Sequence, residues 1–338
     1  MEAYAGIDLH SSNSYIGVID EQDERLYAKR LPNSMNQILV ALEPFKEDLK
    51  GVVVESTYNW YWLVDGLQEE GYKVHLANPS AIKQYDGLKH TDDKTDSFWL
   101  ANMKRLNILP EGYIYPKEER PVRDALRRRL LYVSHRTSHI LSLQSAITRN
   151  LGYKMSGRDI KKLNESDADK LFDEPFLILS VTNSISTVHF LGKKIKEIEK
   201  AVKSHVHLKP EFKCLLTMPG IGDILGLTIM LEAGDLSRFP TVGKYSSYCR
   251  CVKSERFSNK KKKGEGNRKN GNKYLSWAYV EAANFAIRFY PEFESFYKRK
   301  KAKTNGIVAI KALSNKLARA SYYVMRDQVP YDASKLFR

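Results

Sequence analysis

Four acidic residues in the first hundred positions have the types and spacing of a metal-dependent nuclease site. Asp8 follows the apolar run 4–7, and Glu55 follows a second apolar run, 51–54. Asp93 and Asp96 open a segment of helical character and lie one turn apart. Carboxylates at the ends of buried strands are costly to desolvate unless a cation neutralises them, and hard divalent ions with oxygen ligands usually do so. Three separate elements converging on acid therefore predict phosphoryl transfer at paired Mg²⁺ ions.

Two other interpretations of these acids remain open at this point. Asp8 and Glu55 could be plain strand ends, and residues 92–96 could be a helix N-terminus whose dipole favours acidic side chains. The segment 6–9, Gly-Ile-Asp-Leu, also opens actin-like ATPases. That fold needs a second Asp-x-Gly phosphate turn and a glycine-rich adenosine segment, and we find neither in the sequence.

The composition indicates a polyanionic partner. The chain has 338 residues, with 55 Lys and Arg against 40 Asp and Glu, which gives a net charge of +15. A protein this basic usually meets nucleic acid or an anionic membrane. No apolar stretch approaches the roughly 18–20 residues of a membrane span, and no signal peptide precedes the first strand, so we expect no membrane. The three cysteines form neither a zinc motif nor a disulfide framework, which favours a reducing, cytoplasmic setting.

The first third of the chain reads as a mixed sheet covered by helices. Apolar and alternating runs predict strands, helical spacing predicts the segments between them, and the ends of such strands are where a site lies. The expected strands are 3–8, 14–20, 25–31, 52–55 and 72–77, and the expected helices are 33–45, one around 60–67 and one from 93.

The remaining two thirds read as mainly helical. Residues 121–205 carry apolar side chains at spacings of three and four, which predicts two long helices in an antiparallel or intermolecular coiled coil, linked by the polar stretch 156–169. Residues 218–222 form a glycine turn between helices, a helix-hairpin-helix signature that suits phosphate, although a plain helix corner would also explain it. Further helices are expected at 274–289 and 309–325.

A basic loop at 253–273 is the segment with the strongest local charge. Nine Lys or Arg face two Glu, a local net charge of +7, which favours phosphate contact over a merely solvated segment. The predicted nucleic-acid contacts are Gly220, Gly222, Lys253, Arg256, Lys260, Lys261, Lys262, Lys263, Arg268, Lys269 and Lys273. Ser254 and Ser258 lie within this segment, where serines are usually surface hydroxyls. We interpret His10 as a neutral strand-end histidine rather than a metal neighbour.

Two sets of motifs resemble those of the insertion sequence 110 family of DEDD transposases, in its 1111-like branch. The first set resembles the family's N-terminal domain and comprises Gly6 to His10, Val54 to Thr57 and Lys89 to Asp96. The second set resembles its C-terminal transposase domain and comprises Pro219 to Gly222, Arg238-Phe239, Tyr248 to Ser254 and Gly271 to Leu275. The resemblance covers nearly the whole chain, with both sets in the right order.

The resemblance implies a fold in three parts. These are a ribonuclease H-like, Holliday-junction-resolvase-like α/β domain at 1–120, a long-helix coiled-coil insertion at 121–208 and a mainly helical C-terminal transposase domain at 209–330. The last part would hold the helix-hairpin-helix and the catalytic serine.

The resemblance also implies roles for individual residues. Asp8, Glu55, Asp93 and Asp96 correspond to the DEDD carboxylates that hold Mg²⁺; Asp93 is preferred to its neighbour Asp92 because it keeps the three-residue step to Asp96. Counting from Tyr248 places the family's nucleophilic serine at Ser258, with Ser254 as the alternative. Family members commonly have glycine where this chain has Asn259.

The partners implied by the resemblance are nucleic acids and further copies of the chain. A structured non-coding bridge RNA would pair with donor and target double-stranded DNA, so that base pairing reads the sequence and the protein reads the backbone. The enzyme would act in a prokaryotic cytoplasm near the nucleoid, as a dimer assembling into a tetramer. The main rival is a metal-dependent junction resolvase that forms no covalent intermediate; another is a non-catalytic nucleic-acid-binding protein.

Overall fold

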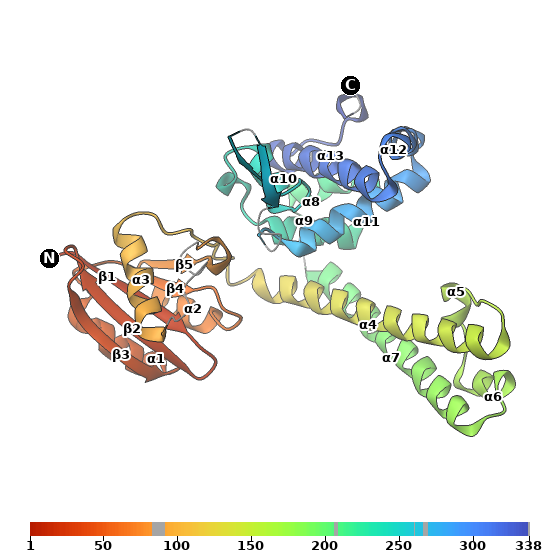
Figure 1. Ribbon diagram of the computed structural model, residues 1–338, viewed down its shortest axis with the longest axis horizontal. Coiled ribbons are helices and arrows are strands. Elements are labelled where there is room, and N and C mark those ends of the chain that lie inside the picture. Colours follow the sequence, from red (N-terminus) through yellow and green to blue (C-terminus); the bar gives the residue numbers. More distant parts are fainter. Residues whose placement is uncertain (83–91, 206–208, 260, 266–269, 337–338) are drawn as a thin grey trace. The chain divides into compact units, whose positions relative to one another are not determined.

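The structure is a computed structural model that describes residues 1–82, 92–205, 209–259, 261–265 and 270–336. Its contacts divide the chain into two units (Figure 1). The first comprises residues 1–117 with 256–270, and the second comprises residues 118–255 with 271–338.

A five-stranded mixed sheet is the centre of the first unit, with the strand order β3-β2-β1-β4-β5. The first three strands form an antiparallel meander, β4 pairs parallel with β1, and β5 pairs parallel with β4. This arrangement brings the ends of β1 and β4 side by side. The strands are β1 (Ala3–Leu9), β2 (Asn13–Asp20), β3 (Arg25–Pro32), β4 (Leu49–Glu55) and β5 (Val74–Ala77).

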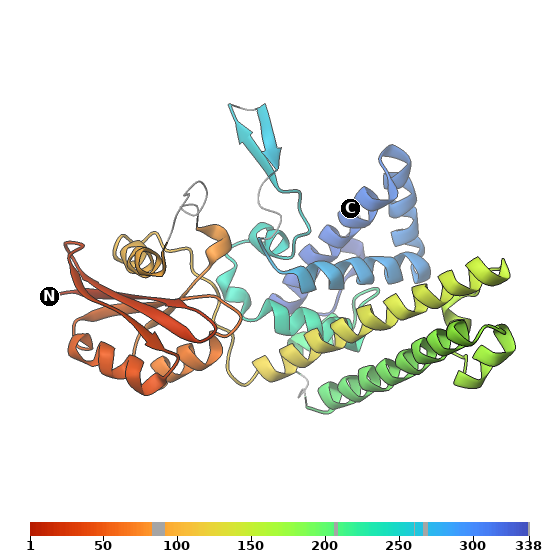
Figure 2. The same ribbon diagram turned by 60° about the horizontal axis from the view of Figure 1, so that its bottom comes forward.

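Helices cover both faces of this sheet (Figure 2). The short helices α1 (Met35–Leu42) and α2 (Tyr61–Glu69) pack on one face, and α3 (Asp93–Arg105) packs on the other. Two 3-10 turns, Glu43–Phe45 and Pro79–Ala81, also belong to this unit. The predicted order of elements, and with it the mixed α/β sheet, is confirmed.

A pair of glycines lets α3 approach the sheet closely. Gly6 of β1 and Gly17 of β2 are direct cross-strand partners. A Cβ at Gly6 would lie 2.0 Å from the Ser97 carbonyl oxygen, and one at Gly17 would lie 2.8 Å from the Ser97 Oγ. The backbone of α3 therefore rests directly on β1 at Gly6, where no larger residue fits without displacing the helix, and its side chains pack on β2 at Gly17.

We predict that Gly6→Ala lowers the free energy of unfolding of the first unit by about 2–4 kcal/mol, because the methyl group must push α3 away from β1. Thermal unfolding followed by circular dichroism measures the loss. Gly112→Ala is the matched control, since a Cβ there meets Leu76 only at 3.5 Å. Equal midpoints for the two variants would contradict the close approach.

A long helical hairpin opens the second unit. Arg129 near the start of α4 pairs with Glu199 near the end of α7, and Ile147 and Val181 share a core at the other end, so the helices run antiparallel (Figures 1 and 2). The two predicted long helices are present and pair within one chain. The elements are α4 (Arg120–Leu151), α5 (Gly157–Ile160), the 3-10 turn Glu165–Asp167, α6 (Ala168–Leu171) and α7 (Pro175–His205).

The expectation that no apolar stretch reaches the length of a membrane span is wrong for α7. Among the described helices, residues 175–204 alone are long and apolar enough, with a mean hydropathy of 1.2 over the best 18 residues. One such helix is a weak indication of a span, because core helices pass the same test. The apolar side chains Val181, Ile185 and Val188 of α7 are instead buried in the core that it shares with α4.

The rest of the second unit is a helical domain around two buried tyrosines. The Tyr245 and Tyr279 hydroxyls lie 2.6 Å apart, and Tyr279 also hydrogen-bonds to Ser321. Helices α10 and α12 had not been predicted. The elements are α8 (Pro210–Leu215), α9 (Asp223–Ala233), the 3-10 turn Leu236–Arg238, α10 (Val242–Tyr248), α11 (Lys273–Phe289), α12 (Pro291–Lys303), α13 (Gly306–Asp327) and the 3-10 turn Ala333–Lys335.

The segment predicted as a basic loop contains a two-stranded hairpin of β6 (Glu255–Ser258) and β7 (Lys261–Glu265), so that prediction is wrong. Asn259, which follows Ser258, has a φ of 50°. Asparagine tolerates this left-handed conformation better than other residues with a side chain, which explains how it can occupy this position.

Candidate active site

Asp8 and Glu55 lie side by side because their strands are parallel neighbours. The register pairs Ile7 with Val54, so the next residue of each strand is one of the two acids. Asp8 is almost fully buried, with 3% of its surface exposed, and burial raises its pKa above the usual range. Burial, together with the neighbouring Asp8 carboxylate, raises the pKa of Glu55 to about 7. A protonated Glu55 donates a hydrogen bond to Asp8.

The start of α3 supplies three acids that differ in their surroundings. Asp92 caps the helix, because its side chain accepts a hydrogen bond from the Thr95 amide at 2.7 Å. Asp93, the first helical residue, instead faces the end of β1. One turn later, burial and the charges of Asp8, Asp92 and Asp93 raise the pKa of Asp96 to about 6. The three-residue step therefore leaves Asp92 as a cap and places Asp93 and Asp96 near Asp8.

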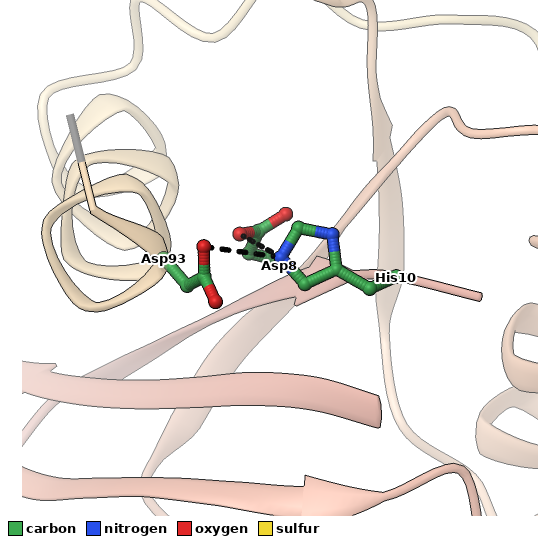
Figure 3. A group of neighbouring side chains, drawn as sticks. All are labelled: Asp8, His10 and Asp93. Carbon is green, nitrogen blue, oxygen red and sulfur yellow. Dashed lines mark ion pairs between the residues drawn. The ribbon is translucent and has the colours of Figure 1, made fainter. Parts of the chain in front are cut away.

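His10 bridges two of the acids (Figure 3). Its Nε2 lies 3.3 Å from Asp8 Oδ2 and 3.2 Å from Asp93 Oδ1. Arg30 of β3 also pairs with Asp93 through its guanidinium. Among the described residues, His10 and Arg30 contact these acids, and burial, together with neighbouring carboxylates, raises the pKa values of Asp8, Glu55 and Asp96.

The donor set fits a divalent cation. Asp8, His10 and Asp93 offer ligand atoms that all lie within 4.8 Å of one another. Carboxylate oxygens are the ligands that hard divalent ions prefer, and imidazole is common with transition ions. Glu55 and Asp96 act electrostatically on the same place. The four acids predicted from the sequence thus lie together, and their charge is of the sign that a cation would neutralise.

Sequence reasoning missed Arg30 and assigned His10 a passive role. The signal for His10 was its spacing, because residues two apart on a strand share a face. The signal for Arg30 was the cross-strand register: Asp8 pairs with Tyr15, and Tyr15 pairs with Arg30, so the three residues form a row across β1, β2 and β3. Such a row requires the pairing of all three strands to be known.

The two candidate serines lie at the two ends of β6. Ser258 is the last residue of the strand, Ser254 precedes it, and both are exposed. Among the described residues, no hydrogen bond connects Ser258 with the carboxylates. The structure brings the four acids together, and Ser258 belongs to the same unit as these acids.

The predicted phosphate-binding cations fall into three groups. Lys253, the described lysines of β7 and Lys273 at the start of α11 are exposed. Arg256 lies in β6, but its side chain is outside the described residues. Lys260, Arg268 and Lys269 also lie outside them.

In the glycine turn at 218–222, the backbone conformation and the packing require a glycine at Gly220 but not at Gly222. Residues 218–221 form a type II turn, with Pro219 at the second position, Gly220 at the third with a φ of 78°, and a hydrogen bond of 3.1 Å from the Ile221 amide to the Met218 carbonyl. A Cβ at Gly220 would lie 2.1 Å from the Ala282 carbonyl oxygen of α11. Gly222, by contrast, is exposed at the start of α9, with open space around its Cα.

Comparison with known proteins identifies two matching regions. Residues 5–150 match a DEDD transposase model of the IS110 type, and residues 212–298 match the model of the IS116/IS110/IS902 transposase family. The chain is 23% identical to the transposase for insertion sequence element IS1328 of Yersinia enterocolitica, over 94% of this chain and 95% of that protein. It is 22% identical to an uncharacterized 43.6 kDa protein of insertion element IS110 from Streptomyces coelicolor, over 46% of this chain and 38% of that protein.

Both family models that the chain matches describe transposases, which are enzymes that act on DNA. The chain belongs to the IS110 family of insertion-sequence transposases. A DEDD transposase uses a divalent metal, and the acids gathered around Asp8 provide a fitting place for it.

We predict that Glu55→Gln raises the stability of the metal-free protein at pH 8. The folded-state pKa of Glu55, about 7, lies above the ordinary value of 4.5, so stability from this group is present below pH 4.5 and is lost as the pH rises through 7. Glutamine remains neutral and avoids that loss, which we place at about 1–2 kcal/mol after discounting for partial exposure. Thermal unfolding in EDTA at pH 5 and pH 8 measures the difference.

Glu47→Gln is the matched control, since it removes an exposed carboxylate from the same unit. We expect Mn²⁺ to stabilise the wild type and the control at pH 8, and to stabilise the Glu55 variant much less. If the Glu55 variant is less stable than wild type in EDTA at pH 8, the raised pKa of Glu55 does not cost the folded protein stability, and the prediction is wrong.

Proposed function

We propose that this transposase cuts and rejoins donor and target DNA under the guidance of a structured bridge RNA, with Asp8, Glu55, Asp93 and Asp96 as metal ligands and Ser258 as the nucleophile. The observation that carries the proposal is the convergence of the four acids from β1, β4 and α3, with the pKa values of three of them raised by burial and by one another. We assign the sheet unit to the ribonuclease H-like class on the same grounds.

The carboxylates would hold Mg²⁺ and so place the scissile phosphate. When bound, Mg²⁺ supplies Lewis-acid stabilisation of the charge that develops during phosphoryl transfer. His10 and Arg30 hold Asp93 in position and offset part of the negative charge while the acids are unneutralised. This arrangement keeps the ligands oriented before the substrate arrives.

Ser258 would attack the scissile phosphorus. Its Oγ forms a new phosphate ester, the bond from phosphorus to the leaving DNA oxygen breaks, the serine proton passes to solvent or to a nearby base, and the leaving oxygen takes up a proton to become a DNA hydroxyl end. Because one ester replaces another, the energy of the broken bond is conserved for rejoining. The exposed end of β6 and the lysines of β7 support this role, since they suit a surface that receives a DNA backbone.

The proposal also covers the domain organisation, the oligomeric state and the cellular location of the enzyme. We assign three functional parts, 1–120, 121–208 and 209–330, with the α4–α7 hairpin as the element that pairs two protomers, and a dimer that assembles into a tetramer. A composite site would then join the serine of one protomer to the acids of another. We expect the enzyme to work in a prokaryotic cytoplasm at the nucleoid.

The test is a covalent adduct. Purified protein, its element-encoded RNA, and labelled donor and target duplexes are incubated with Mg²⁺ and resolved on a denaturing gel. We predict an adduct with wild type and with Ser254→Ala, and none with Ser258→Ala or Asp8→Asn. Ser254→Ala is the matched control, because both serines are exposed beside β6.

Other outcomes point elsewhere. Cleaved ends without attached protein would replace the proposal with a metal-dependent junction resolvase. An adduct that forms equally without RNA would remove the guide. Loss of the adduct only in Ser254→Ala would move the nucleophile to that serine.

A further inference from the structure

The seam of the α4–α7 hairpin contains two arginines where paired helices usually carry apolar side chains. Leu143 of α4 is 1% exposed and packs in this seam. Arg136 and Arg129 precede it at intervals of seven residues and therefore occupy equivalent positions. A charged residue in such a seam costs stability unless it is paired.

The two arginines differ in their partners. Arg129 pairs with Glu199 of α7, with its terminal nitrogen 2.7 Å and its Nε 2.9 Å from Oε1. Arg136 has no ion pair or hydrogen bond within the described ranges, and its Nε is buried without a partner. Burial and the positive charge of Arg129 lower the pKa of Arg136, and the charge of Glu199, which is already paired with Arg129, offsets part of this effect. A bound oxyanion would give Arg136 the negative charge and the hydrogen-bond acceptor that Glu199 gives Arg129.

A groove of about 570 Å³ lies over Arg136. Gly192 of α7 lines the groove beside Arg136, since a Cβ there would be in ordinary contact, 3.7 Å from an Arg136 terminal nitrogen. The helix beyond Gly192 lines the groove with three exposed lysines, none of which has an ion pair among the described residues. They are Lys193, Lys196 and Lys200.

The opposite rim is also basic. Lys161, at the end of α5, lines the groove, and His189 fixes this segment to α7 through a contact of 2.8 Å between its Nε2 and the Leu163 carbonyl oxygen. The single carboxylate in the lining, Glu197, already pairs with Lys194 outside it. The groove therefore presents positive charge from both sides.

We propose that this groove binds the phosphodiester backbone of the nucleic acid on which the transposase acts, with Arg136 donating hydrogen bonds to phosphate oxygens from its floor. This inference rests on the proposed action on nucleic acid but not on the serine or the carboxylates. The step from Lys193 to Lys200 covers about 10 Å of helix axis. Duplex DNA carries one charge per roughly 1.7 Å, so the row meets several phosphates at once.

Such a site positions nucleic acid without reading its sequence, because phosphates are the same at every base pair. The planar guanidinium can donate two parallel hydrogen bonds to one phosphate, and the lysines then act as point charges around it. DNA and RNA share this chemistry. The test therefore includes a probe of each kind.

The experiment compares matched variants of the full chain by fluorescence anisotropy, in EDTA and over a series of salt concentrations. The probes are a labelled 30-base-pair DNA duplex and a labelled RNA hairpin. Arg136→Gln removes the charge in the groove, and Arg128→Gln removes an exposed charge from the same helix. Gly192→Glu places a carboxylate in the groove, and Ser186→Glu places one on an exposed position of α7.

We expect Arg136→Gln and Gly192→Glu to weaken binding of at least one probe about tenfold, with a salt dependence shallower by about 0.9 for each phosphate that the variant no longer neutralises. The two controls should change affinity less than about twofold. The probe whose affinity falls further identifies the polymer that occupies the groove. Equal effects in variants and controls would overturn the site, because binding would then depend on the overall positive charge of the protein and not on this groove. Because no cleavage is needed, failure of the serine proposal would not alter this readout.

Discussion

The close approach of α3 to β1 is the interaction on which the candidate site depends. Gly6 and Gly17 face each other across β1 and β2; the Ser97 backbone occupies the space of a side chain at Gly6, and the Ser97 and Phe98 side chains occupy it at Gly17. Because α3 lies so near the sheet, its first turn meets the end of β1. Asp93 and Asp96 are thus brought to Asp8, which is only two residues along the chain from the glycine that permits the approach.

This geometry concentrates like charge where water is scarce. Burial and mutual repulsion raise the pKa values of Asp8, Glu55 and Asp96, while Arg30 pairs with Asp93 and His10 contacts Asp93 and Asp8. A bare cluster of acids would also repel a phosphate backbone. The chain as a whole is strongly basic, with a net charge of +15, and attracts the same backbone. A cation bound at the acids would remove this local repulsion, so that the DNA backbone could approach the site.

The sequence predicted the sheet and its acids because the signals were local. Apolar runs ending in Asp8 and Glu55 marked two strand ends, and the spacing of Asp93 and Asp96 marked a helix start; the structure has both features. What it could not predict depends on pairing between distant segments. Arg30 reaches Asp93 only through the register of three strands, and Arg136 lies beside Gly192 only because of the register in which α4 and α7 pair. The hairpin of β6 and β7 was missed for a different reason, since a lysine-rich strand such as β7 has no apolar alternation to detect.

The central claim is that the acids gathered by α3 bind a divalent cation, and calorimetric titration with Mn²⁺ tests it most directly. Near pH 6.5, between the pKa of about 6 for Asp96 and about 7 for Glu55, the metal-free cluster holds protons that a cation must displace. We predict saturable binding with release of protons, so that the measured heat differs between buffers of unequal ionisation enthalpy, and loss of this binding in Asp8→Asn. Wild-type binding without proton release, or unchanged binding in Asp8→Asn, would contradict the claim.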